Sequence, residues 1–383
     1  VHREMGIEKG AFAAGQESKA RRSRWEKGEM MKQKGIREYG YVVGRGKPGP
    51  RNLITDVPGV KVGHCTIDTE ENKTGVSVIL PCEGLIFEKK PVAAVYALNG
   101  FGKTVGGMQI EELGTLETPI ALTNTLNVGK VADALVGYTC GECEKAGMEV
   151  QSVNPVVGET NDWRINQITR RVVGEKEVLQ AIAGADTVFE QGAVGAGAGT
   201  VCFGLKGGIG SASRRIPFGK TQYTLGALVQ SNFGEMKDLS ICGDPIGKRI
   251  AQALREEKSE DKGSIMIVLA TDVPLDARQL KRVLKRSAVG LIRTGSYMGH
   301  GSGDVFIGFT NGNYMPESRK RELIPIRCFP ENQMNMIFRA AAEAVEEAIY
   351  HSMVYAKPAR GRKGEVFHSL GEFLEDSFSE SAI

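Results

Sequence analysis

The feature that most constrains the fold of this chain is an apolar run, residues 265–270, that begins directly after the dipeptide Gly263-Ser264. Its length and its aliphatic side chains predict a strand that is buried on both faces. A charged loop, residues 256–262, precedes the dipeptide. Gly-Ser pairs at a strand entrance are commonly simple turns. A serine here is also where a self-cleaving hydrolase would expose a new N-terminal nucleophile, because glycine tolerates the strained backbone that the attack needs.

The composition is that of an ordinary globular protein, with 383 residues, of which 41% are hydrophobic. The 49 Lys and Arg residues nearly balance the 46 Asp and Glu residues. We therefore expect neither nucleic acid nor a membrane surface as a partner. The apolar runs are far shorter than the ~20 residues that cross a bilayer. The first thirty residues lack the apolar core of a signal peptide, so we expect a cytoplasmic location.

Motifs that would bind a metal or a nucleotide are incomplete in this chain. Cys140 and Cys143 have redox or zinc spacing, but no second pair of Cys or His residues accompanies them. The Gly-Lys-Thr triplets at Lys103 and Lys220 lack the earlier glycine of a phosphate loop. Residues 44–49 match the dinucleotide pattern G-x-G-x-x-G, but Pro48 and Pro50 argue against a helix starting there, so we interpret this segment as a turn. We therefore expect no metal and no cofactor.

The remaining pattern alternates between strands and helices. Residues 1–35 show little apolar periodicity and are predicted to be an N-terminal extension, whereas residues 36–383 are predicted to form a single domain. The predicted strands include 74–80, 92–98, 265–271 and 305–310, and the predicted helices include 124–147, 165–183, 280–292 and 334–349. The last helix is a candidate for packing between subunits.

A serine nucleophile needs a base, and histidines are scarce here. Only His64 and His300 lie in glycine-flanked loops, and no G-x-S-x-G elbow is present. An N-terminal serine avoids this shortage, because its own α-amine, with a pKa of about 7.7–8.0, can accept the hydroxyl proton. That amine exists only after the bond between Gly263 and Ser264 is broken.

Four separated motifs, at residues 52–64, 155–160, 263–277 and 301–304, resemble the L-aminopeptidase D-amidase/D-esterase family, which includes β-peptidyl aminopeptidases. The resemblance runs from about residue 36 to about residue 364. It implies an α+β fold, a four-layer αββα sandwich similar to N-terminal-nucleophile hydrolases but with different connectivity. It also implies that a precursor cleaves itself between Gly263 and Ser264 into chains 1–263 and 264–383, and that the cleaved protomers form a homo-oligomer.

The resemblance also implies roles for single residues. Ser264 is both the cleavage residue and the acyl-forming nucleophile. Ser302 forms a hydrogen bond near the freed amine, and Asp304 orients that pair, at a position where family members carry either acid. Asn232 donates to the oxyanion, and Glu159 binds the free amine of the substrate.

Structural roles remain open for these residues. Asn232 is also suited to cap a turn, Glu159 to pair with Arg164 or Arg170, and Ser302 to fill a turn between glycines. His64 and His300 are interpreted as structural or loop residues, because the mechanism needs no imidazole.

These observations predict a self-processing serine aminopeptidase or amidase that releases N-terminal amino acids from small peptides, amides or esters through an acyl-enzyme on Ser264. One alternative is a self-cleaving acyltransferase that passes the acyl group to an amine. Another is a non-enzymatic glycine-rich binding protein. Asn161 stands where we expect a bulky aromatic residue in the substrate site, so the preferred side chain is not predicted.

Overall fold

The computed structural model describes residues 34–255, 263–317 and 322–380, and the chain from Lys34 onward forms one compact unit. Most of the predicted N-terminal extension therefore lies outside the described residues. The first described segment already belongs to the compact unit, because Ile36 and Tyr39 of a short 3-10 turn are buried. Within these ranges, no helix combines the length and the apolar character needed to cross a bilayer.

A five-stranded sheet carries the Gly263-Ser264 junction. Its strands run in the order β3-β11-β10-β9-β8, with β10 parallel to β11 and antiparallel to β9. Their bounds are β3 Pro91–Gly100, β8 Ile209–Phe218, β9 Thr221–Asn232, β10 Ser264–Thr271 and β11 Gly303–Tyr314. Every residue of β10 is buried, which confirms the predicted central strand.

A second sheet of four strands has the order β1-β2-β4-β5. Its strands are β1 Lys61–Asp68, β2 Lys73–Leu80, β4 Ile120–Asn124 and β5 Val156–Thr160. The predicted strands at 74–80 and 92–98 are thus confirmed as parts of β2 and β3. Two small hairpins complete the strands, β6 Val201–Cys202 with β7 Leu205–Lys206 and β12 Ala359–Arg360 with β13 Val366–Phe367.

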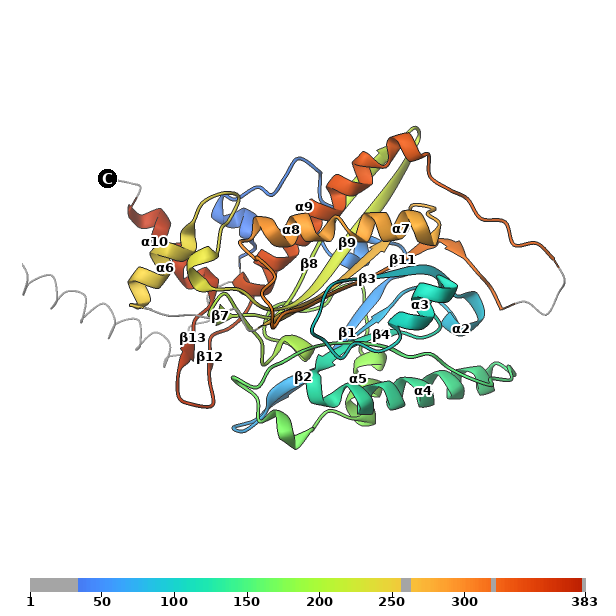
Figure 1. Ribbon diagram of the computed structural model, residues 1–383, viewed down its shortest axis with the longest axis horizontal. Coiled ribbons are helices and arrows are strands. Elements are labelled where there is room, and N and C mark those ends of the chain that lie inside the picture. The colour runs from blue at the N-terminus through green and yellow to red at the C-terminus, as the bar shows by residue number, and fades with distance from the viewer. Residues whose placement is uncertain (1–33, 256–262, 318–321, 381–383) are drawn as a thin grey trace, which may run out of the picture. The chain divides into compact units, whose positions relative to one another are not determined.

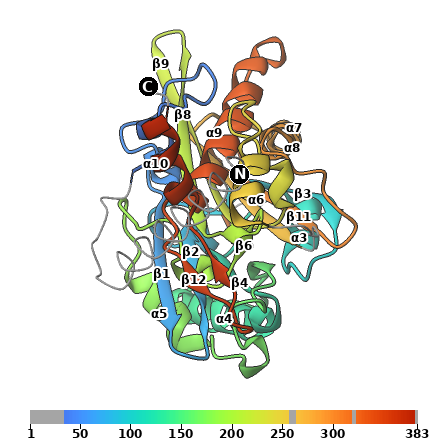
Figure 2. The same cartoon turned by 90° about the vertical axis from the view of Figure 1, so that its left-hand side faces the viewer.

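Helices cover the outer face of each sheet (Figures 1 and 2). On the four-stranded sheet lie α4 Val128–Lys145 and α5 Glu175–Ala183, and on the five-stranded sheet lie α7 Ala277–Leu284 and α9 Asn335–Val354, with α8 Ser287–Arg293 packed against α9. The other helices are α2 Ile86–Lys89, α3 Gly107–Leu113, α6 Ile246–Leu254 and α10 Leu370–Glu380.

The alternation of side chains along β10 explains this layering. Residues 265, 267 and 269 belong to a core that includes the helix α9, whereas residues 266, 268 and 270 belong to a core between the two sheets. A third core joins the four-stranded sheet to α4 and α5. Because a strand turns successive side chains to opposite faces, a strand buried on both sides must lie inside such a stack. The result is the expected αββα sandwich.

Three predicted helices differ from the structure in extent or setting. Of the predicted helix 165–183 only α5 is helical, because Gly174 begins the helix and its backbone N–H donates to Glu177. The predicted helix 280–292 is divided into α7 and α8 at Lys285 and Arg286. The helix α9 is longer than expected, and its residues from Ala340 to Val354 are buried by the chain itself rather than left for a subunit contact.

Candidate active site

Three strand ends of the five-stranded sheet meet at one edge. There β9 ends at Asn232, β10 begins at Ser264 and β11 begins at Gly303. Ser264 pairs directly with Asn232, and Ile265 pairs with Asp304 on the other side. The fold therefore brings together residues from segments that are far apart in sequence.

Ser264 lies where β10 meets the second sheet. Ser264 is 8% exposed, and its Oγ accepts a hydrogen bond from the backbone N–H of Gly303 at 3.1 Å. It shares a strand face with Met266, which packs between the sheets. A Cβ at Gly303 would come within 2.8 Å of the carbonyl oxygen of Phe101, so only glycine brings this N–H so close without displacing the neighbouring chain.

Ser302 and Asp304 form a buried pair beside this serine. The Ser302 hydroxyl donates to Asp304 Oδ1 at 2.7 Å, and both residues are buried. A hydrogen bond to a carboxylate is stronger than one between neutral groups. The proton of Ser302 is thus directed to Asp304, which leaves the lone pairs of Ser302 Oγ to accept from an N–H group. The shorter Asp carboxylate is long enough for this contact.

Two backbone groups fix the side-chain amide of Asn232. Its Oδ1 accepts from the N–H of Val201 at 2.9 Å, and its Nδ2 donates to the carbonyl of Asn161 at 3.0 Å. Both partners are distant in sequence, so this amide does not cap its own turn. An amide nitrogen carries two hydrogens, so one N–H of Asn232 remains for a ligand.

Glu159 is a buried carboxylate with no cation beside it among the described residues. It is 4% exposed, its Oε1 accepts from the N–H of Lys103 at 2.9 Å, and its Oε2 accepts from the hydroxyl of Thr125. Arg170 pairs with Glu71 and Arg164 lies over the ring of Phe367. The alternative ion pairs of Glu159 are therefore not formed, and its charge is available to a cationic ligand.

Gly102 connects this carboxylate with the serine. A Cβ placed on Gly102 would lie 3.5 Å from Glu159 Oε1 and 4.0 Å from the Cα of Gly303, the residue that donates to Ser264. Glu159 and Ser264 therefore face the same small region between the sheets.

The backbone of Asn161 takes part in the candidate site more than its side chain does. Its carbonyl holds Asn232, while its exposed side chain accepts from the N–H of Trp163 at 3.1 Å. Trp163 is 48% exposed. An aromatic side chain is thus present two residues after the position at which the sequence led us to expect one.

The two histidines that we predicted to lie in loops are outside this group of residues, and His64 belongs to the strand β1 rather than to a loop. His64, on β1, contacts Ser77 Oγ at 2.8 Å and the carbonyl of Glu190 at 3.1 Å. Burial lowers the pKa of His64 to about 4. His300 is exposed beside Phe101, with 6.2 Å between ring centroids. In α4, Cys140 is exposed and Cys143 is buried. Across the described ranges, no group of three or more potential ligand residues is placed to hold a metal.

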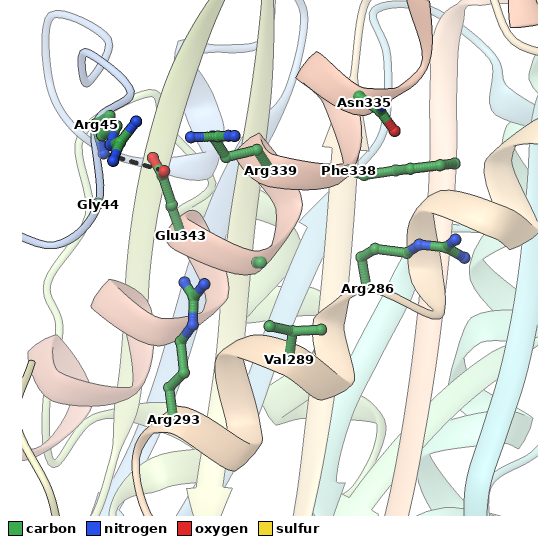
Figure 3. A pocket seen from close by; sticks show the side chains of 10 residues that line it. Gly44, Arg45, Arg286, Val289, Arg293, Asn335, Phe338, Arg339 and Glu343 are labelled. Carbon is green, nitrogen blue, oxygen red and sulfur yellow. Dashed lines mark hydrogen bonds between the residues drawn. The ribbon is translucent and has the colours of Figure 1, made fainter. Parts of the chain in front are cut away.

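A separate cavity of about 570 Å³ lies on the outer helical layer between α8 and α9 (Figure 3). The guanidinium groups of Arg45, Arg293 and Arg339 surround the carboxylate of Glu343, which accepts from the backbone N–H of Arg45. Arg293 also pairs with Glu346 at 3.1 Å. None of the predicted site residues lines this cavity.

Sequence reasoning missed several groups of the site. The N–H groups of Gly303 and Lys103 are backbone donors, and such donors leave no side-chain signal in a sequence. Thr125 follows the end of β4 directly, and a hydroxyl residue at a strand end was a signal that could have suggested it.

Comparisons with known proteins show the family to which the chain belongs. Residues 52–367 match the model of peptidase family S58. The chain is 36% identical over 348 residues to the β-peptidyl aminopeptidase BapA of Sphingosinicella microcystinivorans, covering 85% of this chain and 87% of that protein. The PH0078 protein of Pyrococcus horikoshii OT3 superposes with a TM-score of 0.84 at 43% identity, covering 91% of this chain and all of that chain.

A third similar structure is the L-aminopeptidase D-Ala-esterase/amidase of Ochrobactrum anthropi, described as a new variant of the Ntn hydrolase fold. It has a TM-score of 0.83 and 32% identity, and the match covers 91% of this chain and 98% of that one. Fold and similarity together define the class of this protein, a serine aminopeptidase or amidase that acts on peptides or amides. Within that class, the chain belongs to peptidase family S58.

Proposed function

We propose that the chain cleaves itself between Gly263 and Ser264 and then uses Ser264 as an N-terminal nucleophile. The predicted products are chains 1–263 and 264–383. Support comes from the position of Ser264 as the first residue of a fully buried strand, with a close-fitting glycine before it. The bond that must break is thus held at a strand entrance against β9.

The freed α-amine of Ser264 is the general base of the proposed reaction. It accepts the hydroxyl proton while Oγ forms a bond with the carbonyl carbon of the substrate. The C–N bond to the leaving group then breaks, and the leaving nitrogen takes the proton. Water attacks the resulting ester by the same route, which releases the acyl group and restores the serine. Ser302 accepts from the amine, and Asp304 directs the Ser302 hydroxyl.

Asn232 stabilises the negative charge that develops on the carbonyl oxygen. Its second N–H is the donor, since the first is committed to the carbonyl of Asn161. A donor that is already oriented costs no reorganisation during the reaction, and removal of one such donor typically lowers kcat by about 10²–10³-fold.

Glu159 selects substrates that carry a free amine. A buried carboxylate that lacks a cation gains most from binding an ammonium group. An acylated amine carries no charge and adds bulk, so blocked peptides are excluded. This selection makes the enzyme release N-terminal residues rather than cleave within chains.

The observation that carries this proposal is the position of Ser264 between Asn232, its partner on β9, and Gly303, whose N–H donates to its Oγ. Glu159 lies beside Gly102, next to the same Gly303. The test uses α-alanyl and β-alanyl p-nitroanilides, because relatives are named for β-peptides, each with its N-acetyl counterpart. We expect hydrolysis of at least one free-amine substrate and none of the acetylated forms. Equal hydrolysis of both forms would reject the role of Glu159, and no hydrolysis by fully cleaved protein would reject the proposed substrates.

We also propose that the cleaved protomers form a homo-oligomer. Support comes from the family resemblance and from apolar side chains on α3, where Met108 is 90% exposed and Leu113 is 60% exposed. Light scattering on the purified protein distinguishes an oligomer from a monomer.

A further inference from the structure

Lys206, at the end of β7, is a fully buried cation. Its Nζ donates to three backbone carbonyls, Gly197 at 2.9 Å, Thr200 at 2.9 Å and Gly207 at 2.7 Å. Three acceptors require three N–H donors, which only the charged ammonium form offers. The side chain is therefore a charged clamp on the turn 197–200.

Asp162 supplies the opposite charge. It is buried, its Oδ2 accepts from the hydroxyl of Thr74 at 2.6 Å, and its Oδ1 accepts from Nδ2 of Asn166 at 3.0 Å. A Cβ at Gly199 would lie 2.9 Å from the Cβ of Asp162, so the clamped turn packs directly on this residue. Burial lowers the pKa of Lys206 and raises that of Asp162, and the attraction between the two charges opposes both shifts.

This charged pair adjoins both anchors of the Asn232 amide. The N–H that donates to Asn232 Oδ1 belongs to Val201. Val201 follows Thr200, whose backbone carbonyl accepts a hydrogen bond from Lys206. The carbonyl that holds Asn232 Nδ2 belongs to Asn161, which precedes Asp162. One group that holds the Asn232 amide is thus next in sequence to Thr200, which the charged Lys206 holds, and the other is next to the charged Asp162.

We infer that Lys206 and Asp162 are positioning residues that hold the free N–H of Asn232 in place for the oxyanion. The inference rests on the proposed function of Asn232. Neither residue is a base or an acid of the proposed reaction, because all three protons of Lys206 are engaged by carbonyls and both carboxylate oxygens of Asp162 accept from Thr74 and Asn166. Oxyanion stabilisation is sensitive to small displacements of the donor, so loosening either anchor lowers the rate of the chemical step.

The test measures steady-state kinetics of Lys206→Met per cleaved protomer, with a p-nitroanilide that the wild type hydrolyses. We expect kcat to fall about tenfold or more, with KM within roughly threefold, because the Asn232 donor acts on the charge that forms in the transition state. Asp162→Asn keeps the size of the side chain and removes its charge, and it is expected to shift kcat in the same direction. If Lys206→Met does not fold, Asp162→Asn carries the test.

Arg214→Met is the matched control. Arg214, in β8, is also fully buried and donates to the backbone carbonyls of Ser213, Val43 and Glu343, and none of these groups anchors the Asn232 amide. Its ion pairs are with Glu343 and Glu347 of α9. We expect this variant to lose stability and to keep kcat per folded, cleaved protomer.

A double-mutant cycle separates positioning from a general structural role. Adding Lys206→Met to Asn232→Ala should cause no further loss of kcat, or of the self-cleavage rate where that is the measurable step, because the group being positioned is already absent. Losses that multiply, a change confined to KM, or an equal loss in Arg214→Met would overturn the inference.

A crystal structure of Lys206→Met gives a readout that does not depend on activity. We expect the Asn232 amide to lose at least one of its two anchors, and an unchanged amide would overturn the inference. An inactive wild type would reject the proposed function instead, and the crystal structure would then decide the inference alone.

Discussion

Glu159 is the buried charge that we propose selects the substrates of this site. Its carboxylate is held by a backbone N–H and a hydroxyl, neither of which neutralises it. A carboxylate kept in this state interacts strongly with an ammonium ion, because the surrounding protein screens charge less than water does. We propose that the free amine of a substrate is the group that pairs with this carboxylate.

Replacing Glu159 by Gln removes the charge and keeps an oxygen acceptor for the N–H of Lys103. A hydrogen bond to a charged group is worth about 1.5–3 kcal/mol, so we expect KM to rise at least about tenfold. Self-cleavage should continue, because it uses no substrate amine. Steady-state kinetics on a free-amine p-nitroanilide measures the effect. A variant with unchanged KM would show that another group binds the amine.

The entrance of β10 is the element on which the proposed self-cleavage depends. A Cβ on Gly263 would overlap the carbonyl oxygen of Asn232, the last residue of β9. The antiparallel ladder that pairs Ser264 with Asn232 therefore extends to a position where only glycine fits. The same tight contact keeps the Gly263-Ser264 bond next to Asn232, the proposed oxyanion donor.

Changing Gly263 to Ala should displace the entrance of β10 from β9. Overpacking of this kind typically costs about 1–3 kcal/mol, and we expect self-cleavage to slow markedly or stop. Gly137→Ala in α4 is the matched control, since beyond its chain neighbours and the backbone of its own helix no atom lies within 4 Å of the added Cβ. Gel electrophoresis after timed incubation measures the cut. Normal cleavage in Gly263→Ala would contradict the importance of this close contact.

His64, in the strand β1, makes the stability of the folded chain depend on pH. Its pKa is about 4 in the folded chain against about 6.5 when unfolded, because burial disfavours the charged ring. Between these values the unfolded chain binds more protons. The His64 contribution to stability is therefore present above pH 6.5 and is lost as the pH falls toward 4.

Urea unfolding of the wild type and of His64→Gln tests this dependence. We expect the wild type to lose more stability than the variant between pH 7 and pH 4.5, by roughly 1.4 kcal/mol for each unit by which the two pKa values differ at full effect. Parallel pH curves for the two proteins would show that the folded and unfolded chains bind protons at His64 equally.

At the scale of the whole molecule, the layers could be predicted from the sequence wherever the spacing of apolar side chains shows which face of a strand is buried. The run 265–270 predicted a strand buried on both faces, and in the structure this strand, β10, is the middle strand of the five-stranded sheet. The positions of Ser302 and Asp304 at the start of β11 followed from the same pattern of glycine, polar residue and apolar run. Both predictions rest on local order along the chain.

What the sequence did not reveal depends on contacts between distant segments. The helix 165–183 was predicted too long, because the loosely periodic residues before Gly174 form a loop and a 3-10 turn. Lys206 and Asp162 lie 44 positions apart, and nothing local marks them as neighbours of Asn232. The backbone donors of the site could not be predicted from the sequence either, because every residue except proline has the same N–H.

The central claim is that Ser264 breaks the bond before it. Intact mass spectrometry of the purified wild type and of Ser264→Ala tests this claim most directly. We expect two chains from the wild type, residues 1–263 and 264–383, with serine at the N-terminus of the second, and a single chain from Ser264→Ala. A wild type that is fully active as one uncut chain would contradict the claim.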